Sequence, residues 1–165
     1  MNKIILVFIV YSCFSLFLFA DSKVEELDPA FLNEALGTKV IKKLKKSPII
    51  HLELFKEQSP NTLIAYLFNS GDMKVSGRGY RDKVDCYVLL SPEGKIISVI
   101  VGENKESPKY LKRVLENKLL KEWEGKKITD KIPETVSGAT RTSSAINNSV
   151  EAVLRKLEEI RFFKR

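Results

Sequence analysis

Cysteine and histidine are almost absent from this chain, which has two cysteines and one histidine among 165 residues. Cys13 lies in an apolar leader, so Cys86 stands alone once that leader is removed. A lone cysteine excludes an intramolecular disulfide, a Cys-x-x-Cys redox pair and an iron–sulfur cluster. His51, without partner residues, forms neither a metal site nor a catalytic triad. Any redox function of this chain therefore requires a borrowed cofactor, and we predict no metal site and no catalytic residues of its own.

The first 20 residues have the pattern of a secretory signal. Lys3 is followed by an almost uninterrupted apolar run over residues 4–19, and charge returns at Asp21. The run is at the short limit for a membrane-spanning helix, so an uncleaved membrane anchor stays open as an alternative. Lipoprotein processing at Cys13 is disfavoured because the apolar run continues past it. We expect residues 1–20 to be a signal peptide or anchor and the rest to be extracytoplasmic, in the periplasm or held on the cytoplasmic membrane.

The body of the chain is moderately basic. Without Lys3 there are 27 basic and 21 acidic residues, a net charge of +6. Basic and acidic side chains are interleaved over residues 109–131 and 151–165, with no aromatic platform for bases between them. This pattern indicates a solvated surface, and we predict no nucleic-acid partner.

The hydrophobic pattern predicts one α+β domain, a small antiparallel sheet with helices packed beside it. Residues 21–73 are expected to be N-terminal helices and strands of the same domain, and residues 74–165 its main part. The expected elements, in chain order, are a helix over 29–36 ended by Gly37, a basic amphipathic segment over 38–46 with Val40, Ile41 and Leu44 inward, strands over 49–55 and 62–68 joined by a turn at 58–61, a loop over 69–81, and a hairpin of strands 84–90 and 95–101.

Two further helices are predicted after the hairpin. Ser107 and Pro108 suit the N-cap and first position of a helix that buries Leu111, Val114, Leu115 and Leu119. Trp123 is interpreted as a packing residue near the end of that helix, and Cys86 as a small buried side chain. The second helix carries an apolar stripe of Ile146, Val150, Val153, Leu157 and Ile160.

The segment that precedes this last helix is rich in hydroxyls. Its sequence is Ser137-Gly138-Ala139-Thr140-Arg141-Thr142-Ser143-Ser144, and the helix is expected to start near Thr142 or Ser143. Free N–H groups and the positive end of the helix dipole would face this loop, which suits an anion such as phosphate. The alternative is that these hydroxyls only cap the helix. No glycine-lysine pair follows, so a nucleoside triphosphate loop is excluded.

Residues 137–140 resemble the Ser-Gly-Ala-Thr flavinylation motif of FMN-binding domains, such as the flavin subunits of Rnf complexes and of the sodium-pumping NADH:quinone oxidoreductase. The resemblance extends over residues 74–158, and the matching segments appear in the family's order. They are Gly79-Tyr80, the hairpin with Ser91-Pro92-Glu93-Gly94-Lys95-Ile96, Glu106-Ser107-Pro108, and Trp123-Glu124-Gly125-Lys126.

The resemblance implies an FMN cofactor joined to Thr140 by a phosphoester bond. It also implies a separate flavin transferase as a partner, which takes FMN from FAD, so this chain would be the substrate of that step. The cofactor-binding residues implied by the motifs are Thr140, Ser137, Gly138, Ala139, Thr142, Ser143, Glu106, Ser107 and Pro108.

The chain departs from the family pattern at two places. Many members have an aspartate six residues before the threonine, where this chain has Glu134, and this bears on recognition by the transferase. A glycine-rich segment is replaced by Lys109-Tyr110-Leu111, which bears on how the flavin ring is covered.

We therefore expect an extracytoplasmic flavoprotein that carries electrons between a membrane or periplasmic donor and an acceptor. One alternative is a flavin-dependent reductase of a terminal acceptor. Another is a noncovalent or degenerate FMN-binding module, suggested by Glu134.

Overall fold

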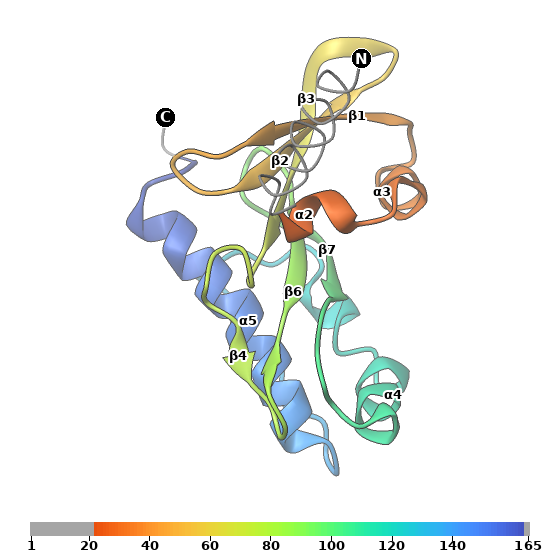
Figure 1. Ribbon diagram of the computed structural model, residues 1–165, viewed down its shortest axis with the longest axis vertical. Coiled ribbons are helices and arrows are strands. Elements are labelled where there is room, and N and C mark those ends of the chain that lie inside the picture. Colours follow the sequence, from red (N-terminus) through yellow and green to blue (C-terminus); the bar gives the residue numbers. More distant parts are fainter. Residues whose placement is uncertain (1–21, 164–165) are drawn as a thin grey trace, which may run out of the picture.

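A computed structural model describes residues 22–163 of the chain (Figure 1). The signal or anchor segment expected over residues 1–20, with Cys13, lies outside the described residues. Within residues 22–163, no helix is both long enough and apolar enough to span a membrane. The described chain is α+β, with an antiparallel sheet and helices against it, as the hydrophobic pattern predicts.

The main sheet has five antiparallel strands in the order β1-β2-β3-β6-β7. Strand β3 precedes residue 74 in the chain and pairs with β6, which follows it. The segments 21–73 and 74–165 therefore contribute strands to the same sheet. Two short strands, β4 and β5, form a separate hairpin beside it. The strand bounds are β1 Val40–Lys45, β2 His51–Lys56, β3 Ser59–Asn69, β4 Gly77–Arg78, β5 Lys83–Val84, β6 Cys86–Leu90 and β7 Ile96–Val101.

Helices cover both faces of this sheet. The bounds are α2 Lys23–Glu26, α3 Pro29–Leu36, α4 Pro108–Glu116, the 3₁₀ helix η1 Lys121–Trp123, and α5 Thr140–Glu159. Every residue of β6 is buried, because alternate side chains enter different cores. Cys86, Val88 and Leu90 pack with the apolar stripe of α5. Tyr87 and Leu89 pack on the other face with residues of α2 and α3.

Several sequence predictions are confirmed here. Helix α3 covers residues 29–36 and ends at Gly37, whose φ of +62° is the left-handed conformation that glycine adopts readily. The hairpin of β6 and β7 is present, and Cys86 is fully buried. On α5, the stripe residues Ile146, Val150, Val153 and Leu157 are buried, whereas Ile160 caps the helix and is half-buried.

Other predictions were wrong in detail. The segment over 38–46 contains strand β1, so Val40 and Leu44 share a face and contact the core whereas Ile41 lies on the opposite face. The turn at 58–61 is shorter, because β3 already begins at Ser59. The loop over 69–81 contains β4. Helix α4 ends at Glu116, and Leu115 is 48% exposed because it points away from the side that buries Val114.

Candidate functional site

The loop over residues 137–139 bends sharply into α5. Gly138 has a φ of +73°, and Ala139 occupies the N-cap position with a φ of −140°. Helix α5 therefore begins at Thr140, earlier than the start near Thr142 or Ser143 that the sequence suggested. Thr140 is the first helical residue and is exposed.

The start of α5 leaves hydrogen-bond donors free. Among residues 22–163, no protein atom accepts a hydrogen bond from the backbone N–H groups of Thr140, Arg141 or Thr142. Such groups at the start of a 20-residue helix, together with its dipole, favour an anion in front of them. The exposed Thr140 hydroxyl lies on the first of these residues.

A basic side chain from another helix lies directly against the same loop. A Cβ atom added to Gly138 would overlap the guanidinium group of Arg113, which comes from α4. The backbone conformation favours glycine at position 138, whereas the flexible Arg113 side chain could move away from a Cβ atom. Arg113 is exposed and forms no ion pair with any described residue, which leaves its charge available to an anion at Thr140.

An open pocket of about 450 Å³ adjoins Thr140. Two tyrosines form part of its wall, Tyr80 with 64% and Tyr110 with 38% of its surface exposed. The Arg141 guanidinium lies 5.6 Å from the centre of the Tyr80 ring, a cation–π arrangement. The volume is in the range of small-molecule sites. The lining residues are Tyr80, Ser107, Tyr110, Gly138, Ala139, Thr140, Arg141 and Thr142.

Glu106 lies behind the pocket and is only 7% exposed. Its Oε1 accepts hydrogen bonds from the N–H groups of Tyr80 (2.9 Å) and Arg81 (3.2 Å), and its Oε2 accepts one from the Thr142 hydroxyl. A Cβ on Gly79 would lie 2.6 Å from Oε1, so the turn can approach only with glycine there. Glu106 therefore joins the turn between β4 and β5 to the first turn of α5.

Two buried polar residues of α5 fix the loop before it. Ser143 Oγ accepts from the Val136 N–H (3.0 Å) and donates to the Ala139 carbonyl (2.9 Å). Asn147 accepts from the Trp123 indole N–H (3.0 Å) and donates to the Pro133 carbonyl (2.8 Å). The loop over residues 133–139 is thus attached to α5 at both ends.

These contacts correct the capping interpretation of the hydroxyl cluster. The N-cap is Ala139, which has no side-chain acceptor, and the hydroxyls of Thr142 and Ser143 are buried in the contacts described above. Trp123 is buried and packs in the core, as predicted.

The predicted cofactor residues fall into three groups. Thr140, Gly138, Ala139, Thr142 and Ser107 line the pocket. Glu106 and Ser143 are buried behind it and support its walls. Ser137 and Pro108 are exposed beside it and are not among its lining residues.

Sequence reasoning missed Arg113 and Arg141 as site residues. A signal for Arg113 was present, because Tyr110 and Arg113 are three residues apart and so share one side of a helix. Cys86 lies away from the pocket, in the core, where burial raises the pKa of its thiol to about 12. The described residues contain no cluster that would hold a metal ion.

Residues 79–155 match the family model of the FMN-binding domain. This segment is an FMN-binding domain. Its cofactor is accordingly FMN, and every residue that lines the pocket lies within the matched segment. No curated protein matches the chain.

The pocket fits the FMN assignment on its own geometry. A phosphate needs donors and positive charge, which the start of α5 and Arg113 provide. A planar ring system needs an open site with flat walls, and the FMN-binding domain presents Tyr80 and Tyr110 there. Helices α2 and α3 and strands β1–β3 precede the matched segment in the chain.

Proposed function

We propose that this protein is an extracytoplasmic electron carrier that holds FMN covalently through a phosphoester to Thr140 Oγ. The observation that carries the proposal is the placement of one exposed hydroxyl, on Thr140, in the pocket beside free N–H groups. The other hydroxyl that the first turn of α5 contributes to the pocket, on Thr142, is buried and bonded to Glu106.

The residues around Thr140 would hold the phosphate after attachment. The N–H groups of the first turn of α5 would donate to its free oxygens, and Arg113 would balance its negative charge. Tyr80 and Tyr110 would contact the flavin ring. Bound FMN supplies the redox chemistry, because it accepts and releases one or two electrons.

Among the described residues, none that lines the pocket is suited to deprotonate Thr140. Neither a carboxylate nor a histidine lines the pocket, and the Glu106 carboxylate is occupied by three donors. A separate transferase would therefore remove the proton from the hydroxyl. The bond from Thr140 Oγ to the FMN phosphorus would form, and the bond to AMP in FAD would break.

The extracytoplasmic location is supported by the leader pattern of residues 1–20. A covalent bond retains the flavin where free FMN is not replenished. In this account one membrane or periplasmic partner donates electrons to the flavin, and another accepts them.

The test is the intact mass of the full chain coexpressed with a flavin transferase. Wild type should gain the mass of one FMN less one water, and peptide mapping should place it on Thr140. Arg113→Ala should lower the labelled fraction severalfold, whereas Lys112→Ala, on the same helix and also exposed, should not.

An unlabelled wild type would contradict the proposal unless Glu134→Asp restored labelling. Glu134 is exposed and, within residues 22–163, pairs only with Lys131, at 3.1 Å, so this substitution should leave the fold unchanged. Label on a residue other than Thr140 would show that the acceptor is wrong.

A further inference from the structure

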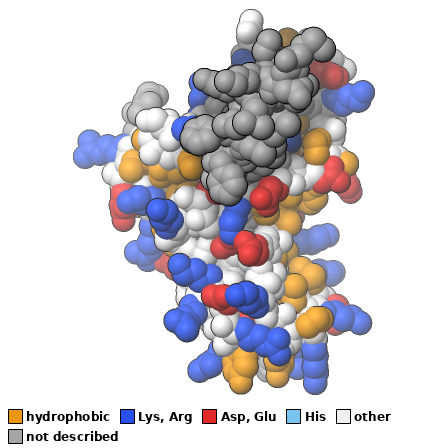
Figure 2. Space-filling view, in the orientation of Figure 1, with side chains coloured by type: hydrophobic (Ala, Val, Ile, Leu, Met, Phe, Trp, Pro, Cys, Tyr) orange, Lys and Arg blue, Asp and Glu red, His pale blue; other side chains and the backbone are white. Residues whose placement is uncertain are grey.

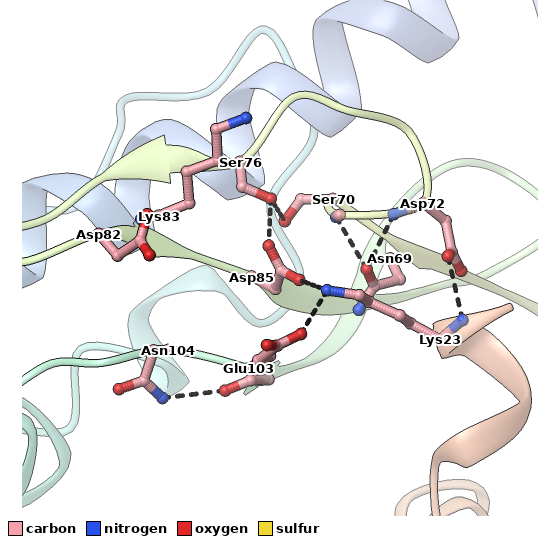
Figure 3. Close-up of polar contacts among 12 residues, drawn as sticks. Lys23, Asn69, Ser70, Asp72, Ser76, Asp82, Lys83, Asp85, Glu103 and Asn104 are labelled. Carbon is pink, nitrogen blue, oxygen red and sulfur yellow. Dashed lines mark hydrogen bonds and ion pairs between the residues drawn. The ribbon is translucent and has the colours of Figure 1, made fainter.

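The chain is fixed to the fold directly after its leader. The Asp72 carboxylate accepts hydrogen bonds from the N–H groups of Lys23 and Val24, both at 3.0 Å. The Lys23 ammonium contacts Asp85 at 2.5 Å and Glu103 at 2.6 Å (Figure 3). The Tyr87 hydroxyl donates to the Lys23 carbonyl at 3.0 Å. The described chain is thus bound to the fold from Lys23 onward.

Strand β1 carries a concentrated positive charge at the edge of the sheet. Residues 39–46 include five lysines and no acidic residue. Four of these lysines are exposed, and Lys42 is half-exposed. Because β1 pairs only with β2, no described strand covers its other edge, although Asn33 of α3 accepts a hydrogen bond from the Val40 N–H at 3.1 Å. Elsewhere on the face seen in Figure 2, blue basic side chains are interspersed with red acidic ones.

The lysines of β1 lie far from Thr140. Helices α2 and α3 and strands β1–β3 form the upper part of the molecule in Figure 1, whereas α4 and the first turn of α5 lie at its lower end. Helix α2 packs on β2 and β3, and β1 is the next strand of the same sheet. The exit of the leader and the basic strand therefore share one part of the molecule, and the flavin site occupies the other.

We propose that β1 docks on an anionic lipid surface and that this contact turns the Thr140 pocket toward the aqueous phase. The proposal rests on the extracytoplasmic location in the proposed function and on the alternative in which residues 1–20 are kept as a membrane anchor. Lysines near a bilayer are attracted to anionic headgroups, and a second attachment besides an apolar segment fixes orientation. The partner that exchanges electrons with this flavin is then a water-exposed protein surface and not a quinone within the lipid.

The test measures the distance of two sites from the lipid headgroups. The full chain, with Cys13→Ser, carries a spin label at Gln58→Cys in the turn beside β1 or at Asn117→Cys after α4. It is reconstituted in phosphatidylglycerol or phosphatidylcholine bilayers that contain nickel-chelating headgroups. Cys86 is buried and remains unlabelled. In phosphatidylglycerol, nickel should increase the spin relaxation rate of the label at position 58 severalfold more than that of the label at position 117.

Two quadruple variants, matched in charge, complete the test. Replacing Lys42, Lys43, Lys45 and Lys46 by Gln should abolish the difference between the two labels. The same change at Lys112, Lys121, Lys127 and Lys131 should preserve it. If the first variant folds poorly, wild type in phosphatidylcholine replaces it in the test. That sample lacks the anionic headgroups and keeps every lysine. Equal relaxation at both sites of wild type, or an unchanged difference in the β1 variant or in phosphatidylcholine, would overturn the docking.

The mass of the same samples separates the two proposals. Chain that carries FMN on Thr140 but shows no β1 effect disproves the docking alone. Chain that shows the β1 effect without FMN disproves the flavin attachment alone.

Discussion

The first turn of α5 leaves backbone donors free beside the exposed Thr140, whereas its last turn satisfies its carbonyls and is covered by aromatic rings. At that end, the N–H groups of Arg161 and Phe162 donate to the carbonyls of Glu158 and Leu157, and Arg161 has a φ of +52°. A residue in the left-handed conformation commonly follows the last turn of a helix. The difference separates an end available for a ligand from an end that completes the core.

The closing end is built from interlocked rings. Phe162 lies edge-on to His51 at 5.0 Å, to Tyr66 at 5.1 Å and to Phe68 at 5.3 Å between ring centres. Phe163 joins Phe162 and Tyr66. These rings contact one another, whereas Tyr80 and Tyr110 at the opposite end are 64% and 38% exposed. An aromatic residue points to a ligand here only where the protein itself does not cover it.

The largest effect should come from Thr140→Val, which keeps the shape of the side chain and removes its hydroxyl. Covalent FMN should be lost entirely while the melting temperature stays close to that of wild type. Intact mass and fluorescence in a denaturing gel give the readout. Thr140→Ser should retain label, at least in part, and covalent flavin in Thr140→Val would refute the assignment.

Glu106→Gln tests the support behind the open end. The amide offers one acceptor oxygen in place of a carboxylate that takes three hydrogen bonds, so the free energy of unfolding should fall by about 2 kcal/mol. Urea unfolding of the protein without flavin measures this. Glu134→Gln makes the same chemical change on the surface and should alter stability by less than about 0.5 kcal/mol. An equal loss of stability in Glu106→Gln and Glu134→Gln would show that the Glu106 hydrogen bonds do not hold the site together.

Cys86→Ser changes the core beneath the middle of α5, away from both ends. A buried hydroxyl in place of sulfur should lower the free energy of unfolding by roughly 1 to 2 kcal/mol and leave FMN labelling unchanged. Because burial raises the thiol pKa to about 12, Cys86 of the folded protein should resist alkylation at neutral pH. Loss of label from folded Cys86→Ser would link the thiol to the flavin site.

The smallest effect concerns His51 at the closed end. Burial lowers the pKa of His51 below the usual 6.5, so the unfolded chain takes up the proton first as the pH falls. Stability should therefore decline as the pH drops below about 6.5. The decrease in melting temperature from pH 7.5 to pH 5.5 should be smaller in His51→Phe than in wild type. Tyr66→Phe, in the same cluster, should keep the wild-type decrease.

Periodicity predicted the elements whose side chains alternate clearly. The stripe of α5 and the hairpin of β6 and β7 were predicted because each buries a regular set of apolar residues. The resemblance to FMN-binding domains led to Thr140 and to the loop around it. Strand β1 was misjudged because lysines occupy both faces of an edge strand, and Val40, Ile41 and Leu44 fit more than one period.

The contacts made by the residues that support the site were not predicted from the sequence. Arg113 meets Gly138 only after α4 packs beside α5, and the spacing of the two residues along the chain does not indicate it. Glu106 was expected to bind the cofactor because it lies in a family motif, yet its oxygens face Tyr80, Arg81 and Thr142. Contacts between distant segments depend on tertiary packing, which local patterns do not encode.

The three hydrogen bonds of Glu106 have a consequence for how the site opens. They join segments near residues 80, 106 and 142, so none of these segments separates without breaking bonds to the others. Regions linked in this way exchange their amide hydrogens as one cooperative unit. The amides of Tyr80 and Arg81, although they lie in a turn at the surface, should therefore exchange with solvent as slowly as the first hydrogen-bonded amides of α5.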